Sequence, residues 1–285
     1  MTSTPRTAQT LQLADGRTLG YASYGDPAGA PLIYCHGGGS SRLEPAYADE
    51  HARRNRIHII AVDRPGYGLS SPVPEFSFQA FGQDVLALAD ALGIAGFVIL
   101  GMSAGAPYAL HLAVSAPGRV RFVALINPSP DTAQPEWKEV SWLARLGTSA
   151  TRLPWLMSRA IASMVGNPGK AAASFAKKTG WDATAVRQFE DMIREGLRQP
   201  GGREVLRREA SAVLHQPWGL DWSKLKSPVV AICGAGDGAR PLYLALSRRY
   251  PIVSVTEIPG PHMPIVTGKA WDRIGNALSA FRVNS

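Results

Sequence analysis

The feature that most constrains the fold is the alternation of short apolar runs with helical patterns along most of the chain. Several runs are β-branched and continuously apolar, which is typical of strands covered on both faces. A helix that repeatedly follows a strand makes parallel crossovers. We therefore expect an α/β domain whose mostly parallel sheet has helices on both faces. The expected strands are 10–13, 19–24, 32–35, 57–62, 97–100, 122–126, 229–233 and 252–258, and the expected helices are 44–54, 78–92, 103–116, 242–249 and 271–281.

The turn-like segment 14–17, Ala-Asp-Gly-Arg, joins the first two runs and predicts an antiparallel hairpin at the start of the sheet. With 285 residues, the chain has the length of one large domain or of one domain with a sizeable insertion. The alternating rhythm stops between residues 131 and 222, where the segment is helical in pattern and holds six of the seven tryptophans. We expect this segment to be an insertion whose aromatic underside forms a substrate pocket. The alternative, which is compatible with the first, is that the tryptophans fill a small helical core.

The apolar runs are far too short to cross a bilayer, which takes about 20 residues. Residues 1–10 are polar and lack the apolar core of a secretory signal. The two cysteines, Cys35 and Cys233, lie inside or at the end of expected strands, which favours reduced thiols over a disulfide. We expect a cytoplasmic protein, monomeric or homodimeric, that does not associate with membranes.

The chain carries 30 Lys and Arg against 22 Asp and Glu, a formal net charge of +8. These basic residues are dispersed, no block of five or more occurs, and no nucleic-acid recognition motif accompanies them. We expect a solvated basic surface and no nucleic-acid partner.

The strongest chemical signal is the pentapeptide Gly-Met-Ser-Ala-Gly at 101–105, between an expected strand and an expected helix. A Gly-x-Ser-x-Gly sequence in that context predicts a tight turn that exposes the serine at a helix N-terminus. Only small residues fit on either side of such a turn, and Gly101 and Gly105 meet this demand. Ser103 is therefore the candidate nucleophile.

A second signal, His-Gly-Gly-Gly at 36–39, directly follows the expected strand 32–35. Glycines allow the backbone to approach a ligand and turn N–H groups toward it. We expect the amides of Gly38 or Gly37, together with that of Ala104, to stabilise an oxyanion. His36 is expected to be a structural hydrogen-bonding residue. The loop 63–70, Asp-Arg-Pro-Gly-Tyr-Gly-Leu-Ser, has turn residues and is expected to be anchored by Asp63 and Arg64.

A nucleophilic serine needs a base, and the base needs an orienting acid. Of the six histidines, His262 alone combines a late position with a loop after an expected strand. Asp237 follows the expected strand 229–233, at the end where open α/β sheets gather their functional residues. The chain order Ser103, Asp237, His262 is one of the known orders for such a triad.

Together, the motifs at 36–39, 63–70, 101–105, 234–241 and 260–262 resemble the α/β-hydrolase family over most of the chain. The resemblance implies an eight-stranded sheet with a helical cap inserted after the sixth strand. The core domain would comprise 1–130 and 223–285, and the cap 131–222. Pro261 departs from the family, in which a small residue usually precedes the histidine. Some relatives place the acid after the sixth strand, so Asp131 is the alternative to Asp237.

These residues predict a serine hydrolase that acts on a carboxylic ester or lactone of a small to medium apolar molecule. Relatives that hydrolyse halides or epoxides carry Asp in place of Ser103. Carbon–carbon bond hydrolysis, thioester or amide hydrolysis, and a non-catalytic receptor remain alternatives. No metal-binding or nucleotide-binding motif occurs, so we expect no cofactor. The residues expected to contact the substrate are Met102, Trp137, Trp142 and Trp155.

Overall fold

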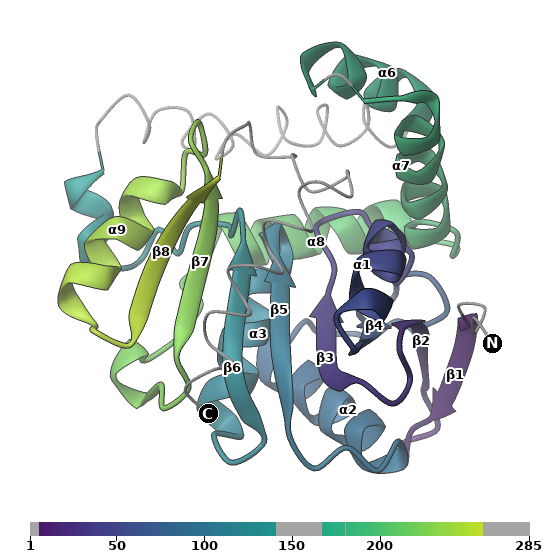
Figure 1. The fold of residues 1–285 in the computed structure, drawn as a ribbon, viewed down its shortest axis with the longest axis horizontal. Coiled ribbons are helices and arrows are strands. Elements are labelled where there is room, and N and C mark those ends of the chain that lie inside the picture. The colour runs from purple at the N-terminus through teal and green to yellow at the C-terminus, as the bar shows by residue number, and fades with distance from the viewer. Residues whose placement is uncertain (1–5, 141–166, 180, 259–285) are drawn as a thin grey trace.

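The computed structural model describes residues 6–140, 167–179 and 181–258 (Figure 1). Eight strands form one sheet in the order β1-β2-β4-β3-β5-β6-β7-β8, which confirms the expected mostly parallel, eight-stranded α/β architecture. The strands are β1 (Arg6–Gln12), β2 (Thr18–Gly25), β3 (Ala30–Cys35), β4 (Ile57–Val62), β5 (Phe97–Met102), β6 (Val120–Ile126), β7 (Val229–Gly234) and β8 (Val253–Ile258).

The sheet opens with the expected antiparallel hairpin of β1 and β2. Strand β2 also pairs antiparallel with β4, whereas each pairing from β4 and β3 onward to β8 is parallel. The carboxyl ends of β3 to β8 therefore meet at one edge, the upper edge in Figure 1. The loops that carry the candidate site residues leave the sheet along this edge.

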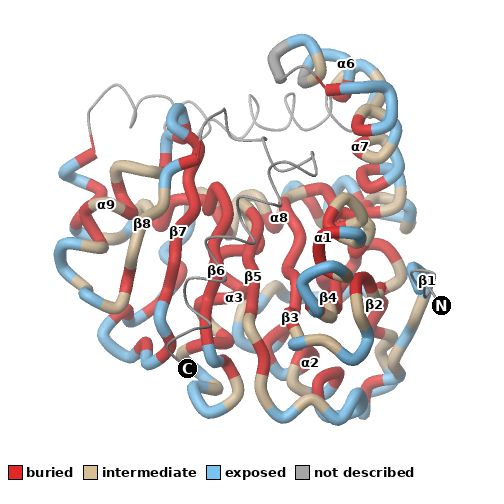
Figure 2. The backbone as a smooth tube through the Cα atoms, viewed as in Figure 1, coloured by how far each residue is buried: buried red, intermediate tan, exposed pale blue. Residues whose placement is uncertain are grey.

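Helices cover both faces of the sheet, because alternate residues of each strand point to opposite sides. In β7, Ala231 and Cys233 belong to one apolar cluster, and Ile232 between them belongs to another. The first cluster lies beneath α2, α3 and α9, and the second beneath η1 and α1; Figure 2 shows the buried strands between them. These helices are η1 (Glu44–Ala48), α1 (Asp49–Arg54), α2 (Phe78–Ala91), α3 (Ala106–Ser115) and α9 (Arg240–Arg249).

Between β6 and β7 the described residues form helices and no strand. They are the 3₁₀ helices η3 (Pro135–Glu139) and η4 (Trp222–Lys224) and the helices α6 (Pro168–Thr179), α7 (Ala183–Gly196) and α8 (Gly202–His215). Asp182 caps α7 by accepting hydrogen bonds from the amides of Thr184 and Ala185. In Figure 1, α8 runs along the edge of the sheet at which the parallel strands end.

Helices α7 and α8 are docked closely on the loops that follow β3 and β4. A side chain added at Gly196 of α7 would lie 2.2 Å from the carbonyl oxygen of Ser40, so glycine permits this approach. The Ser41 hydroxyl donates to the carbonyl of Met192, and the Gly68 amide donates to that of Gly196. This part of the insertion is therefore held against the core by backbone contacts as well as by side chains.

The tryptophans of the insertion that the structure describes lie mainly in apolar cores. Trp137, Trp218 and Trp222 belong to the first core cluster, and Trp181 packs with Phe189 in a separate cluster of α6 and α7. Their bulk therefore stabilises the packing of the insertion.

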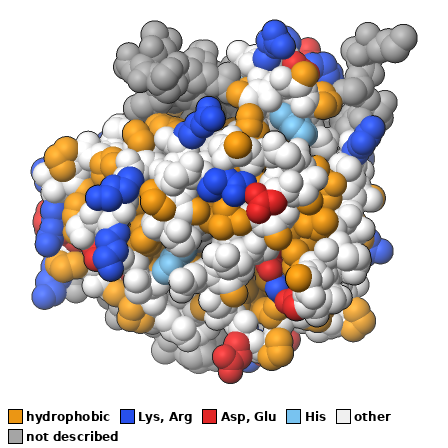
Figure 3. All heavy atoms as spheres, turned by 90° about the horizontal axis from the view of Figure 1, so that it is seen from below, with side chains coloured by type: hydrophobic (Ala, Val, Ile, Leu, Met, Phe, Trp, Pro, Cys, Tyr) orange, Lys and Arg blue, Asp and Glu red, His pale blue; other side chains and the backbone are white. Residues whose placement is uncertain are grey.

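In the described residues, no helix is long and apolar enough to span a membrane. Basic side chains are dispersed among apolar and neutral ones on the face shown in Figure 3.

Candidate active site

The backbone turns sharply at Ser103, between β5 and the 3₁₀ helix η2 (Ser103–Gly105) that leads into α3. Ser103 has a positive φ of 48°, one of three non-glycine residues with this conformation in the described chain. Such a conformation is strained for a residue with a side chain and persists only where the surroundings impose it. The strand–turn–helix geometry that the Gly-x-Ser-x-Gly sequence predicts is thus present around the candidate nucleophile.

The two glycines of this turn are required by space. A Cβ at Gly101 would lie 2.7 Å from the carbonyl oxygen of Gly105 and 2.9 Å from the Cα of Ala106. A Cβ at Gly105 would lie 2.3 Å from the carbonyl oxygen of Cys35. Gly105 therefore brings the turn against the end of β3, where the loop 36–39 begins.

This loop lies beside Ala104, the residue after the candidate nucleophile. A Cβ at Gly38 would be 3.5 Å from the Cβ of Ala104. The amide of Gly37, the alternative donor in the sequence prediction, instead donates to Oε2 of Glu44 over 2.7 Å. Among the described residues no acceptor bonds the Gly38 amide, so Gly38 and Ala104 are the pair that suits an oxyanion.

His36 is fully buried and fixed by two backbone contacts. The Arg64 amide donates to Nε2 over 3.2 Å, so Nδ1 carries the proton and donates to the carbonyl of Gly37 over 2.8 Å. Burial, together with the positive charge of Arg64, holds the pKa of His36 well below its ordinary value. His36 therefore stays neutral and orients the loop, as the sequence analysis expected.

The loop after β4 is anchored by two buried side chains, Asp63 and Arg64. Asp63 accepts from the amides of Arg42 and Leu69 and pairs with the Arg42 guanidinium at 2.8 Å. Burial nevertheless raises the pKa of Asp63. Arg42 also pairs with Glu195 of α7 at 2.7 Å, which links this loop to the insertion.

Glu209 of α8 is a buried partner of Arg64 that the sequence analysis did not identify. Its relative exposure is 0%, and it forms a bidentate pair with Arg64 at 2.6 and 2.9 Å. A sequence signal existed, because Leu206 and Val213, three residues before and four after Glu209, place it on the apolar face of the helix. A glutamate on such a face indicates a buried partner.

Asp237 lies in the loop after β7 and is 5% exposed. Its amide donates to the carbonyl of Gly234, and its Oδ1 accepts from the amide of Ala239 over 2.8 Å, which orients the carboxylate. The alternative acid, Asp131, accepts from the Ala133 amide and the Gln134 side chain in its own turn, and it also accepts from the backbone of Trp218. Burial raises the pKa of Asp131.

The candidate base His262 and the candidate substrate contacts Trp142 and Trp155 lie outside the described residues. Met102 is buried directly before the candidate nucleophile, with its Cγ 3.6 Å from the position of a Cβ at Gly37. Trp137 is 6% exposed and packs in the main core.

Glu44 is a second residue that the sequence analysis missed. Besides the Gly37 amide, it accepts a hydrogen bond from the Tyr34 hydroxyl over 3.0 Å. Burial raises the pKa of Glu44 to about 7, although Gly37, Tyr34 and the charge of Arg64 oppose this rise. A titratable carboxyl group is thus bonded directly to the loop 36–39.

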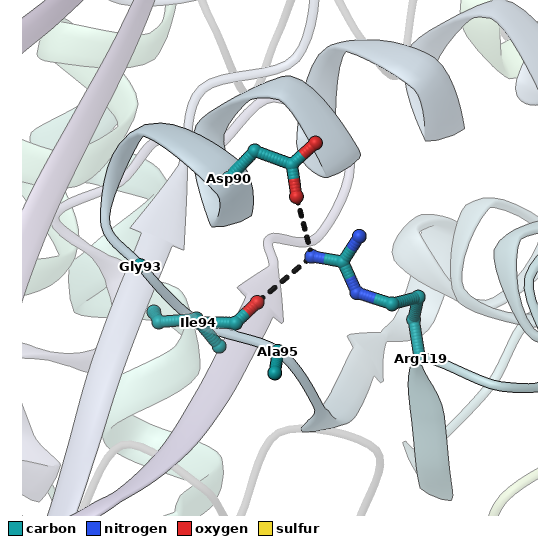
Figure 4. A pocket seen from close by; sticks show the side chains of 5 residues that line it. All are labelled: Asp90, Gly93, Ile94, Ala95 and Arg119. Atoms are coloured by element: carbon teal, nitrogen blue, oxygen red, sulfur yellow. Dashed lines mark hydrogen bonds and ion pairs between the residues drawn. The ribbon is translucent and has the colours of Figure 1, made fainter.

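At the opposite edge of the sheet, a separate open hollow of about 400 Å³ lies between the end of α2 and the start of β6 (Figure 4). Arg119 crosses it and donates to Asp90 and to the carbonyl of Ile94. This hollow is remote from Ser103, because β5 begins beside it and ends at the candidate nucleophile. In the described parts of the chain, no group of three or more His, Cys, Asp or Glu side chains is arranged to hold a metal ion.

Comparison with known proteins places this arrangement in context. The alpha/beta hydrolase fold family matches residues 30–247. A non-heme chloroperoxidase of Streptomyces lividans is 30% identical over 129 residues, which are 42% of this chain and 45% of the relative. An sn-1-specific diacylglycerol lipase of Mus musculus is 26% identical over 180 residues, which are 63% of this chain and 55% of the relative. The chain thus spans about half the length of these two relatives.

Solved structures show the same fold over nearly the whole chain. A putative alpha/beta hydrolase from Nostoc sp PCC 7120 superposes with a TM-score of 0.74 at 22% identity, covering 98% of each chain. An esterase from Rhodococcus superposes with a TM-score of 0.68 at 20% identity, covering 98% of this chain and 99% of the other.

Proposed function

Because the chain belongs to the alpha/beta hydrolase fold family, we propose that it is a serine hydrolase with Ser103 as nucleophile, His262 as base and Asp237 as orienting acid. The observation that carries the proposal is the strained turn at Ser103, with its φ of 48°, packed against the glycine loop 36–39. This conformation is costly, and a costly conformation at a residue with a nucleophilic side chain is characteristic of active sites.

In the proposed reaction, His262 removes the hydroxyl proton of Ser103 as the oxygen attacks the substrate carbonyl carbon. The amides of Gly38 and Ala104 donate to the resulting oxyanion, and each such donor contributes about 3 kcal/mol to transition-state stabilisation. Collapse of the tetrahedral intermediate breaks the bond to the leaving alkoxide, which takes the proton from His262. Water, activated by the same histidine, then attacks the acyl-enzyme and releases the acid product.

The strand register supports Asp237 as the partner of His262. Gly234 at the end of β7 is paired with Ile258 at the end of β8. Asp237 follows Gly234 by three residues in the sequence and His262 follows Ile258 by four, so both residues come shortly after strand ends that lie side by side. Four extended residues span up to about 14 Å. Strands β5 and β8 are three positions apart in the sheet, also about 14 Å, so four residues of chain are long enough for the proposed role of His262.

The surroundings of the oxyanion loop favour an apolar substrate. Leu206 of α8 would be 3.4 Å from a Cβ at Gly39, and Ile193 of α7 would be 3.9 Å from it. These side chains give the loop an apolar neighbourhood, so we propose an ester or lactone with an apolar acyl group. An ester-cleaving activity also fits the lipase and esterase names of two similar proteins. The insertion 131–222 is proposed to cap this site.

The proposal is tested with purified protein on p-nitrophenyl esters of increasing acyl length, a set of lactones and an anilide. We expect turnover of esters or lactones, with Ser103→Ala reducing kcat by at least about 1000-fold because the nucleophile is lost. Ligand binding without turnover on any substrate would indicate a receptor instead. Turnover that Ser103→Ala leaves intact would exclude the proposed nucleophile.

A further inference from the structure

Glu209 occupies an unusual position for a residue of the insertion, because all of its hydrogen bonds lead into the core. Oε1 accepts from Arg64 Nε at 2.6 Å and from the Tyr108 hydroxyl at 2.8 Å. Oε2 accepts from Arg64 Nη2 at 2.9 Å and from the Tyr67 hydroxyl at 2.6 Å. Tyr108 lies on α3, the helix that begins beyond the nucleophile turn. One carboxylate of α8 thus joins two segments of the core, the loop 63–70 and α3.

Arg64 carries this connection to the oxyanion loop. Its guanidinium lies 5.1 Å from the ring centre of Tyr67 and 5.0 Å from that of Tyr108, so the group is held between two aromatic rings. The donors that do not face Glu209 point at the loop: Nη1 donates to the carbonyl of His36, and Nη2 donates to that of Gly37 over 3.2 Å. Arg64 is fully buried, so water does not compete for these donors.

The Gly37 carbonyl belongs to the same peptide group as the Gly38 amide. A trans peptide is planar, so its C=O and N–H point in opposite directions. The Gly37 carbonyl accepts from Arg64 Nη2 over 3.2 Å, from His36 Nδ1 over 2.8 Å and from the Ser40 amide over 3.2 Å, and these three donors together fix the direction of the Gly38 N–H. A hydrogen bond from a cation to the carbonyl also polarises the peptide, which makes its N–H a stronger donor.

We propose that Glu209 is a positioning residue for the oxyanion hole, acting through Arg64 on the Gly37–Gly38 peptide. Helix α8 then completes the catalytic apparatus as well as covering it. This inference rests on the proposed hydrolase function. Glu209 thereby differs from residues that only dock the insertion, because its substitution should weaken transition-state stabilisation as well as the stability of the fold.

The chain offers a matched control in Glu195 of α7. Glu195 also joins the insertion to a buried arginine, pairing with Arg42 at 2.7 Å. The Arg42 guanidinium, however, donates to Asp63 and to the carbonyl of Thr7, and among the described residues it makes no bond to the carbonyls of His36 or Gly37. Glu195→Gln therefore weakens docking of the insertion and leaves the orientation of the Gly38 amide unchanged.

The experiment compares Glu209→Gln and Glu195→Gln with the wild type in kcat and KM for p-nitrophenyl butyrate and in the rate of labelling by a fluorophosphonate. The phosphoryl oxygen of that probe occupies the oxyanion hole. Complete loss of one oxyanion donor costs about 100–1000-fold in kcat, so for a misdirected donor we expect a fall of about 10–100-fold. In Glu209→Gln, the labelling rate should fall in parallel, with KM within about threefold of wild type. For Glu195→Gln, we expect kcat within about threefold.

Equal losses of kcat in the two variants would overturn the inference, as would an unchanged kcat in a folded Glu209→Gln protein. If Glu209→Gln does not fold, Tyr108→Phe takes its place, because it removes one hydrogen bond from Glu209. This variant should lower kcat several-fold at constant KM. An unchanged kcat would again overturn the inference. A wild-type protein that neither turns over esters nor is labelled at Ser103 would refute the proposed function itself, which distinguishes the two failures.

Discussion

The substitution Gly105→Ala tests whether the glycines of the nucleophile turn are required by space. The added methyl group would lie 2.3 Å from the carbonyl oxygen of Cys35 and 2.9 Å from both the Cys35 carbonyl carbon and the His36 oxygen. All three are backbone atoms at the end of β3, and none can rotate away as a side chain would. The turn and the loop 36–39 must therefore move apart.

The size of this movement gives the expected effect. Restoring an ordinary contact requires a displacement of about 1 Å, and overpacking of this kind costs typically about 1–3 kcal/mol. A misplacement of about 1 Å in an active site reduces the rate by about 100-fold. We therefore expect Gly105→Ala to lower kcat for a p-nitrophenyl ester by about two orders of magnitude and to lower Tm by several degrees.

The control is Gly118→Ala, at a glycine where a Cβ would meet no atom within 4 Å. Both variants are measured for kcat, and their Tm values are compared by thermal unfolding at one pH. Gly118→Ala should retain wild-type activity. If Gly105→Ala is as active as Gly118→Ala, catalysis does not depend on the close approach of the turn at Ser103 to the loop 36–39.

Three further predictions concern neighbouring residues. Burial raises the pKa of Glu44 to about 7, so the stability that its protonated carboxyl group gives the fold below pH 4.5 is lost as the pH rises through 7, by up to about 3 kcal/mol. Glu44→Gln should show no such loss when the free energy of unfolding in urea is compared at pH 5 and pH 8. Equal losses in the wild type and the variant would contradict this. Asp237→Asn should reduce kcat by orders of magnitude and Asp131→Asn by far less; the reverse order would identify Asp131 as the acid. Gly196→Ala would place a Cβ 2.2 Å from the Ser40 oxygen and should destabilise the fold by about 1–3 kcal/mol in urea unfolding, whereas an unchanged midpoint would argue against close docking of α7.

The sequence predicted the strands well because each strand is marked by a pattern of neighbouring residues. Buried parallel strands are continuously apolar, and the expected run 57–62 matches β4 residue for residue. The order of strands is not local, and nothing in the sequence places β2 beside β4. Pairing partners depend on how the crossovers pack, so they became evident only in the structure.

For the candidate site, the sequence identified Ser103 and the loop 36–39 because a tight turn restricts its residue types. It did not find that the Gly37 amide bonds Glu44, since no spacing rule connects a glycine to an acid seven residues later. Glu209 was missed for a different reason. Its partner Arg64 is 145 residues away, and only the helix periodicity around Leu206 and Val213 hinted at its burial.

The described tryptophans show a similar limit of sequence patterns. Their concentration in the insertion suggested an aromatic pocket, yet Trp218 and Trp222 are 3% and 2% exposed within the core. The same large aromatic residues occur in apolar cores and in the walls of pockets. Composition alone does not distinguish the two.

The most direct measurement is intact-mass analysis after incubation with a fluorophosphonate, followed by peptide mapping. We expect one adduct per chain, located on Ser103, because the proposed triad activates the hydroxyl of this residue at its strained turn. The adduct should be absent in Ser103→Ala and should form much more slowly in Asp237→Asn. A folded protein that remains unlabelled, or an adduct that persists in Ser103→Ala, would contradict the assignment of Ser103 as the nucleophile.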